Sequence, residues 1–127
     1  MQRKLHILGI PMDLGQNRRG VDTGPSAVRY AHLKARLEQL GHVVHDEGNV
    51  AVPNPEEHVA EGTGRRLRAV TAVCQTLYER TCPWMDAGDF AIFLGGDHSI
   101  SIGSVAAAAR NGPISVIWVD AHSDFNT

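Results

Sequence analysis

Two kinds of apolar pattern alternate along this sequence, and their alternation constrains the fold more than any other feature. Short continuous apolar runs are typical of buried strands, whereas apolar residues at every third or fourth position are typical of helices. The order along the chain is strand, helix, strand, helix, strand, helix, strand. Because helices cover both faces of a parallel sheet in such domains, we expect an α/β fold with a parallel β-sheet and helices on both faces.

Proline, glycine and the ends of the apolar runs set the expected boundaries. Pro25 suits the first position of the first helix, and Gly41 suits its C-terminal cap. Predicted strands cover 4–10, 42–50, 89–96 and 114–120, and predicted helices cover 25–41, 63–80 and 99–112. The side chains expected to face the core are Tyr30, Leu33, Leu37 and Leu40 in the first helix and Leu67, Val70, Cys74 and Leu77 in the second.

Composition excludes several classes of protein. Of the 127 residues 43% are hydrophobic, so the chain can form a core and is one domain or part of one. A formal net charge of −2 gives no reason to expect nucleic acid or a membrane surface as a partner. Two cysteines make no disulfide framework, and no apolar run approaches the roughly 20 residues that span a bilayer. The N-terminus is strand-like rather than a signal peptide, so we expect a cytoplasmic protein.

Polar residues with metal-binding side chains follow the last two predicted strands. Ligands of parallel sheets collect at the carboxyl ends of the strands. Asp120, His122 and Asp124 alternate along an extended segment, so their side chains would point to one side. Two carboxylates and an imidazole suit Mn, Fe, Zn or Co. The other interpretation of this triplet is a turn of hydrogen-bonding Asp residues with a solvated histidine.

The second polar element is "GGDHS", which covers 95–99 and ends the strand at 89–96. Its glycines permit a close approach of the backbone to another segment. Asp97 has three possible roles: a helix N-cap, a carboxylate that orients His98, or a metal ligand. His98 is either a metal ligand or a residue that bonds the backbone where the next helix begins. Two such clusters at successive strand ends favour a metal site.

The motifs "FLGGDHSISIGSV" and "VIWVDAHSDFNT" together resemble the ureohydrolase family, whose members hydrolyse guanidino compounds at a two-manganese centre. The segment "GIPMDLGQNRRGVDTGPSAVRYAHL" is similar to the family's N-terminal segment. The resemblance implies an arginase-like three-layer α/β/α fold. It also implies that residues 1–127 are the N-terminal part of a single ureohydrolase domain, with the C-terminal half absent.

The resemblance assigns roles to individual residues. His98 and Asp124 would ligate one Mn²⁺ and His122 the other, and Asp120 would bridge the two ions that activate the attacking water molecule. Asn126 would contact the α-carboxylate of arginine, which makes arginase a closer match than agmatinase. Arg18 would lie in the loop at the substrate entrance, although an exposed turn explains that loop equally well.

The implied reaction is hydrolysis of the guanidinium group of L-arginine to ornithine and urea, with two Mn²⁺ that lower the pKa of a water molecule. Alternatives are agmatinase or another ureohydrolase and, in a different class, a truncated non-catalytic module that docks on complete subunits. The family resemblance favours a homo-oligomer, a trimer or hexamer, for the full-length protein.

Residues 1–127 contain only four of the six ligand positions that the resemblance implies, because the family's later Ser-x-Asp-x-Asp motif is absent. The later histidine that shuttles protons and the glutamate that binds the guanidinium are absent as well. We therefore expect weak Mn²⁺ binding and no arginine hydrolysis from these residues alone. We also expect the strand at 114–120 to be left unpaired or wrongly paired, as an edge that promotes aggregation.

Overall fold

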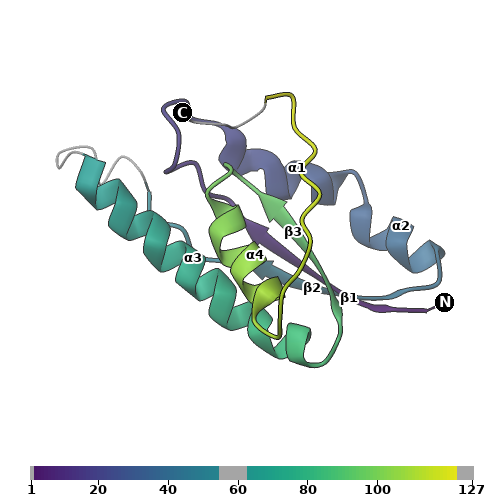
Figure 1. Ribbon diagram of the computed structural model, residues 1–127. Helices are drawn as coiled ribbons and strands as arrows, with labels where there is room; N and C mark the ends of the chain where they lie inside the picture. Colours follow the sequence, from purple (N-terminus) through teal and green to yellow (C-terminus); the bar gives the residue numbers. More distant parts are fainter. Residues whose placement is uncertain (1, 55–62, 123–127) are drawn as a thin grey trace.

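A parallel sheet of three strands forms the centre of the computed structural model, which describes residues 2–54 and 63–122. The strands are β1 (Lys4–Ile10), β2 (Val43–Asn49) and β3 (Phe90–Gly95), in the order β2-β1-β3. The helices are α1 (Gly24–Tyr30), α2 (Leu33–Gln39), α3 (Thr63–Asp86) and α4 (Ile100–Ala109), with a short 3₁₀ helix η1 (Val21–Thr23) before α1. Figure 1 shows α1 and α2 on one side of the sheet and α3 and α4 on the other. The predicted α/β fold is confirmed.

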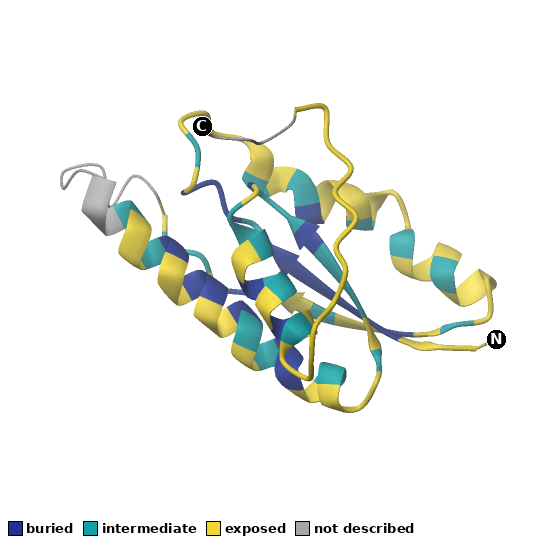
Figure 2. Ribbon diagram, viewed as in Figure 1, coloured by how far each residue is buried: buried dark blue, intermediate teal, exposed yellow. Residues whose placement is uncertain are grey.

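Each face of the sheet has its own apolar core, because side chains of β1 alternate between the two faces. Leu5 and Ile7 point toward α2, and Leu8 and Ile10 point toward α3. The central strand is therefore buried along nearly its whole length, as the dark blue arrow in Figure 2 shows. His6 is also buried on β1, between the carboxylates of Glu47 and Asp89 at 2.7 and 3.0 Å.

The single helix predicted for 25–41 is wrong, since the chain forms two short helices there. His32 separates them with a φ of 61°, in the left-handed region. This break rotates α2 relative to α1, so only Leu33 and Leu37 of the predicted stripe pack against the core. Tyr30 and Leu40 are 84% and 74% exposed instead.

The first part of the chain's longest helix was predicted correctly, but α3 continues to Asp86 rather than ending at 80. Val70, Cys74 and Leu77 are buried in the core as expected, whereas Leu67 is 66% exposed near the start of the helix. Both cysteines are free and buried, and burial raises the pKa of the Cys74 thiol. No helix among the described residues is long and apolar enough to cross a membrane.

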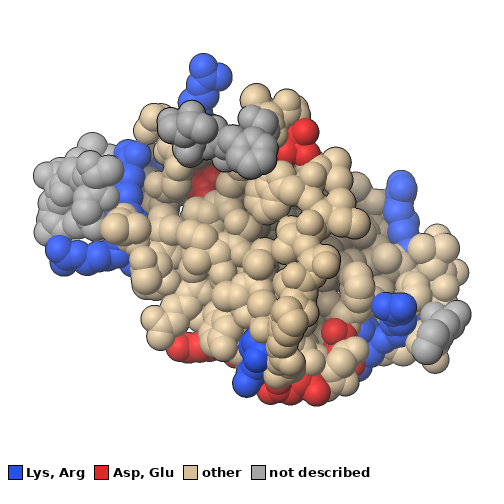
Figure 3. All heavy atoms as spheres, viewed as in Figure 1, with Lys and Arg blue, Asp and Glu red and all other residues tan. Residues whose placement is uncertain are grey.

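The strand predicted for 114–120 is absent from the structure. The segment has no regular hydrogen bonding, and Ile117 and Val119 are 90% and 93% exposed. In Figure 1 the segment runs as a long yellow coil past α4. Figure 3 shows the same side of the molecule, where charged side chains are few except at the rim. A strand needs a partner for its N–H and C=O groups, and among the described residues none pairs with it. Of the two outcomes expected for 114–120, no pairing or wrong pairing, the structure shows no pairing with the described residues.

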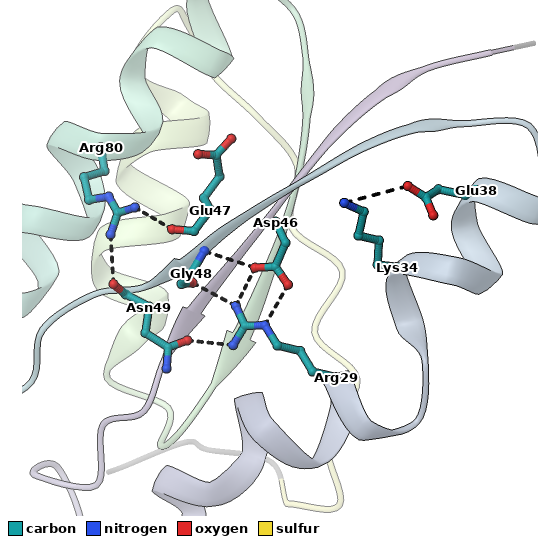
Figure 4. A network of polar contacts seen from close by, with 8 residues as sticks. All are labelled: Arg29, Lys34, Glu38, Asp46, Glu47, Gly48, Asn49 and Arg80. Atoms are coloured by element: carbon teal, nitrogen blue, oxygen red, sulfur yellow. Dashed lines mark hydrogen bonds and ion pairs between the residues drawn. The ribbon is translucent and has the colours of Figure 1, made fainter.

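A guanidinium ties the first helix to the edge strand. Arg29 of α1 donates two hydrogen bonds of 2.8 Å to the carboxylate of Asp46 on β2. It also donates to Asn49 Oδ1 at 2.7 Å and to the carbonyl of Gly48 at 2.8 Å. Figure 4 shows all of these contacts, together with Arg80 of α3 on the other side of β2. One planar group thus fixes where α1 lies relative to the sheet.

Candidate active site

The turn after β3 is joined to the loop after β1 by backbone hydrogen bonds that continue the sheet beyond the strand ends. Asp97 N–H donates to the carbonyl of Met12 at 2.8 Å, and Gly96 N–H donates to that of Ile10 at 3.4 Å. Gly96 has no room for a side chain, because a Cβ there would overlap the backbone of Met12. The second glycine of "GGDHS" thus serves a close approach of two backbones, as the motif predicted.

Asp97 is 8% exposed, and its carboxylate accepts hydrogen bonds from both sides. One oxygen accepts from the backbone N–H of Gly15 at 2.7 Å. The other accepts from the N–H of Ser99 at 3.0 Å and from the Ser99 hydroxyl. Helix α4 has Ser99, not Asp97, as its N-cap residue. The N-cap role is therefore wrong for Asp97, whose carboxylate connects two loops, while its roles toward His98 and toward a metal stay predictions.

The structure brings His98, Asp120 and His122 together. Nε2 of His98 lies 2.9 Å from Oδ2 of Asp120, and Nδ1 of His122 lies 3.3 Å from Oδ1 of the same carboxylate. The ring of Trp118 meets the ring of His98 edge-on, with the ring centres 5.3 Å apart. His98 therefore shares one site, near the carboxyl ends of β1 and β3, with two residues that lie 22 and 24 positions further along the chain.

Hydrogen bonding stabilises the ionised form of the central carboxylate. The backbone N–H of His122 donates to Asp120 Oδ1 at 2.7 Å. This bond and, to a smaller degree, the imidazoles of His98 and His122 hold the pKa of Asp120 below its ordinary value, while burial opposes them. The side chain of Asp120 is 14% exposed, and those of His98 and His122 are 62% and 84% exposed. An anionic oxygen pair thus lies between two accessible imidazoles.

The donor set has the chemistry of a transition-metal site, although its arrangement is not that of one. A carboxylate and two imidazoles form the mixed oxygen and nitrogen set that suits Mn, Fe, Zn or Co. Among the described residues, however, no three His, Cys, Asp or Glu side chains are arranged so that they could hold a metal ion. In this structure Asp120 contacts the imidazoles directly. The predicted ligand Asp124 and the predicted substrate residue Asn126 lie outside the described residues.

A cleft of about 520 Å³ connects this cluster with the loop after β1. Gly15, Gln16 and Val21 form one wall, and 96–99 and 120–122 form the other. Arg18, predicted near the substrate entrance, is exposed in the same loop but is not among the residues that line the cleft. Its carbonyl accepts a hydrogen bond of 2.6 Å from the side chain of Gln16.

One residue of this region was missed from the sequence. Asp13 is 3% exposed and accepts hydrogen bonds from Nε of Arg19 at 2.8 Å and from the N–H of Gly20 at 3.3 Å. Its position between Met12 and Leu14, both buried, was a usable signal. A carboxylate inside an apolar run must have partners, and the nearest cations in the sequence are Arg18 and Arg19.

Comparison with known proteins identifies the family to which this chain belongs. The family model described as Arginase family matches residues 3–127. This chain belongs to the arginase family. The curated arginases of Bacillus subtilis strain 168 and Brevibacillus brevis are 43% and 42% identical to it over 128 aligned positions. These alignments cover 100% of this chain and 43% of each relative, so the chain spans less than half the length of these arginases.

Solved structures of the arginase family have the same fold. Arginase from Bacillus caldovelox is 43% identical, with a TM-score of 0.89 over 98% of this chain and 43% of that one. Arginase from Entamoeba histolytica, solved in complex with L-ornithine, is 29% identical, with a TM-score of 0.81 over 99% of this chain and 43% of that one. The parallel sheet and its helices are thus an arginase-type α/β fold.

Proposed function

We propose that this chain forms part of an arginase-type hydrolase that cleaves the guanidinium group of L-arginine. The observation that carries the proposal is the convergence of His98, Asp120 and His122 at one cleft, with 2.9 and 3.3 Å between the carboxylate and the two imidazoles. Water adds to the guanidinium carbon and one C–N bond breaks, which gives urea and ornithine. Membership of the arginase family supports this choice of reaction.

The residues proposed to hold two Mn²⁺ are His98, Asp120, His122 and Asp124, with Asp120 as the bridge. When bound, the two cations would lower the pKa of a water molecule and offset the negative charge of the carboxylates. Asp120 is suited to its role because its carboxylate lies between both imidazoles, 2.9 Å from His98 Nε2 and 3.3 Å from His122 Nδ1. His98 and His122 are accessible from the cleft that Gln16 also lines.

Substrate recognition is proposed at two places. Asn126 would bind the α-carboxylate of arginine, and this contact separates arginase from agmatinase, whose substrate has no such group. Arg18 would contribute from the loop on the facing wall. We further propose that the whole enzyme is cytoplasmic and forms a homo-oligomer, either a trimer or a hexamer.

A polypeptide of residues 1–127 alone is proposed to bind Mn²⁺ weakly and to release no urea. The described residues hold no complete metal group, and the family resemblance implies further carboxylate ligands that this sequence does not contain. A second function, docking on complete subunits without catalysis, is favoured by the exposed apolar side chains of Ile117 and Val119. Mixing the chain with a full-length arginase and measuring the mass of the complexes tests it, since docking requires mixed oligomers.

A chimera tests the proposed reaction. Residues 1–127 replace the matching 43% of Bacillus subtilis arginase, and urea release is measured with arginine and agmatine. We expect turnover of arginine that is lost in Asp120→Ala and kept in the surface control Asp86→Asn. A folded chimera that releases no urea from arginine, or prefers agmatine, overturns the proposal.

Metal binding by the 127-residue chain provides a second measurement that does not depend on the chimera. The electron paramagnetic resonance signal of free Mn²⁺ reports how much metal is bound. Asp120→Ala and His98→Ala should each weaken binding, whereas Asp86→Asn should not. Equal affinity in all variants would count against Asp120 and His98 as ligands.

A further inference from the structure

Two buried carboxylates hold the loop after β1 at its two ends. At the first end, Asp97 accepts the N–H of Gly15 at 2.7 Å. At the second end, Asp13 accepts Nε of Arg19 at 2.8 Å and the N–H of Gly20 at 3.3 Å. The side chain of Asp13 is 2% exposed, and Asp97 as a residue is 8% exposed. Charge-assisted hydrogen bonds in such a setting are stronger than those between neutral groups.

The segment between these two contacts is short and mostly exposed, with Gln16 half-buried at the cleft. It contains only Gln16, Asn17 and Arg18, and the Gln16 side chain closes it by a hydrogen bond of 2.6 Å to the Arg18 carbonyl. Gly15 and Gln16 line the same cleft as His98 and His122. The two carboxylates therefore determine how this loop faces the candidate metal ligands.

The hydrogen bond between the Asp97 carboxylate and Gly15 is additional to a backbone hydrogen bond that already joins the same two loops. The backbone N–H of Asp97 already joins the two loops through the Met12 carbonyl at 2.8 Å. The carboxylate reaches further, to Gly15, and with its other oxygen it binds the Ser99 N–H at 3.0 Å. It thus couples the loop to the turn that carries His98. Both oxygens must accept, so an amide at this position would place an NH₂ group against an N–H donor.

We propose that Asp13 and Asp97 are positioning residues, which hold the loop 15–20 in one conformation against the cleft so that substrate meets a preformed wall. The proposal rests on the proposed function for the meaning of the cleft, and it adds two residues that act through the loop rather than on the substrate. Substrate binding then does not have to order the loop, which would otherwise weaken affinity.

Trypsin measures the conformation of the loop directly, because Arg18 and Arg19 are its cleavage sites. In the 127-residue chain, Asp97→Asn and Asp13→Asn should each raise the rate of cleavage at these arginines by about tenfold, the equilibrium effect of losing one charge-assisted hydrogen bond. Asp86→Asn is the matched control, since Asp86 pairs with Arg110 away from the cleft. Amide exchange at Gly15 should accelerate to a similar degree in Asp97→Asn, while exchange in β1 stays unchanged.

Unchanged cleavage and unchanged Gly15 exchange in Asp97→Asn would overturn the proposal. Acceleration that extends equally to β1 would also overturn it, because the carboxylate would then stabilise the whole fold rather than the loop. The less disruptive Ser99→Ala, which removes only the hydroxyl contact, should leave Gly15 protected.

Kinetics of the chimera test the role in recognition. Asp97→Asn and Asp13→Asn should raise KM for arginine by about tenfold with little change in kcat, since they remove substrate binding rather than transition-state contacts. An equal loss in kcat with unchanged KM contradicts a positioning role. A wild-type chimera without urea release would instead refute the proposed function, so the two failures are distinguishable.

Discussion

Arg29 Nε lies 2.8 Å from Asp46 Oδ2 and its Nη2 lies 2.8 Å from Asp46 Oδ1, so guanidinium and carboxylate face each other through two parallel hydrogen bonds. The side chains are 25% and 27% exposed, which separates this pair from an ordinary surface ion pair. The same guanidinium also binds the chain around the end of β2. Arg29 therefore connects α1 to the sheet edge.

Replacing Arg29 by Ala should destabilise the chain by about 2 kcal/mol, because the Asp46 carboxylate and two further oxygens lose a charged donor. Arg29→Lys should recover only part of this loss, since an ammonium group cannot form the planar pair. Urea denaturation followed by circular dichroism measures the change. As a control, Lys34→Ala breaks an exposed pair at 3.8 Å and should cost less than about 0.5 kcal/mol.

The same pair predicts a dependence of stability on acid. The hydrogen bond from Arg29 is the main reason that the pKa of Asp46 lies below its ordinary value of 3.8. Because the folded pKa is the lower one, the stabilisation is fully present above the unfolded value and is lost as the pH falls through the folded value. The stability difference between the wild type and Asp46→Asn should therefore be constant from pH 7 to about pH 5 and should vanish in stronger acid. A difference that grows as acid is added would contradict this assignment.

Gly96→Ala should damage the fold and the cleft together. A Cβ at this position would overlap the Met12 carbonyl and lie 2.7 Å from the Met12 nitrogen, and backbone atoms cannot move aside as a side chain can. We expect a loss of about 2 kcal/mol or more. Thermal unfolding of Gly96→Ala beside Ser104→Ala, which removes a weak helix contact of 3.4 Å, provides the comparison.

Replacing His32 by Gly should not destabilise the fold, in contrast to Gly96→Ala. It adopts a φ of 61° between α1 and α2, a conformation that glycine reaches without strain. His32→Gly should be neutral or stabilising by up to about 1 kcal/mol, whereas His32→Ala, which keeps the Cβ, should not stabilise. Denaturation midpoints of the two variants decide the matter, and equal midpoints would mean that the imidazole rather than the backbone is the relevant feature.

Association of the chain should depend on its exposed apolar segment. Ile117→Lys together with Val119→Lys should increase the monomer fraction at high concentration without lowering the free energy of unfolding, since these side chains are 90% and 93% exposed. Size-exclusion chromatography with light scattering measures the monomer fraction. Val73→Lys serves as the contrast, because Val73 is 3% exposed and its replacement should unfold the protein.

Sequence patterns predicted the strands of the sheet well, because β1 and β3 are apolar runs bounded by Pro and Gly. They failed where a local signal depended on distant partners. The helix break at His32 occurs at a residue other than glycine, so the sequence gives no signal for it. The apolar run at 114–120 lacks a neighbouring strand among the described residues. Alternation of side chains cannot supply such a partner.

The candidate site was predictable to a similar degree. The sequence predicted that His98, Asp120 and His122 would meet, and the structure places them together although 114–120 forms no strand. The contact between Asp97 and Gly15 was not predictable, since it joins residues 82 positions apart through a backbone donor that has no sequence signature. Asp13 was predictable in principle, because its main partner Arg19 lies only six positions further along the chain.

The backbone bonds from Gly96 and Asp97 to the loop after β1 have a consequence for how the cleft can move. They make the cleft floor part of the same cooperative unit as the sheet, so its amide protons should exchange with solvent only when β1 and β3 separate. Opening of the cleft by thermal motion would then have the free energy of a sub-global unfolding event. A ligand that needs more space should find it in the loop tip at 16–18, because the floor beneath His98 is hydrogen-bonded to the chain that follows β1.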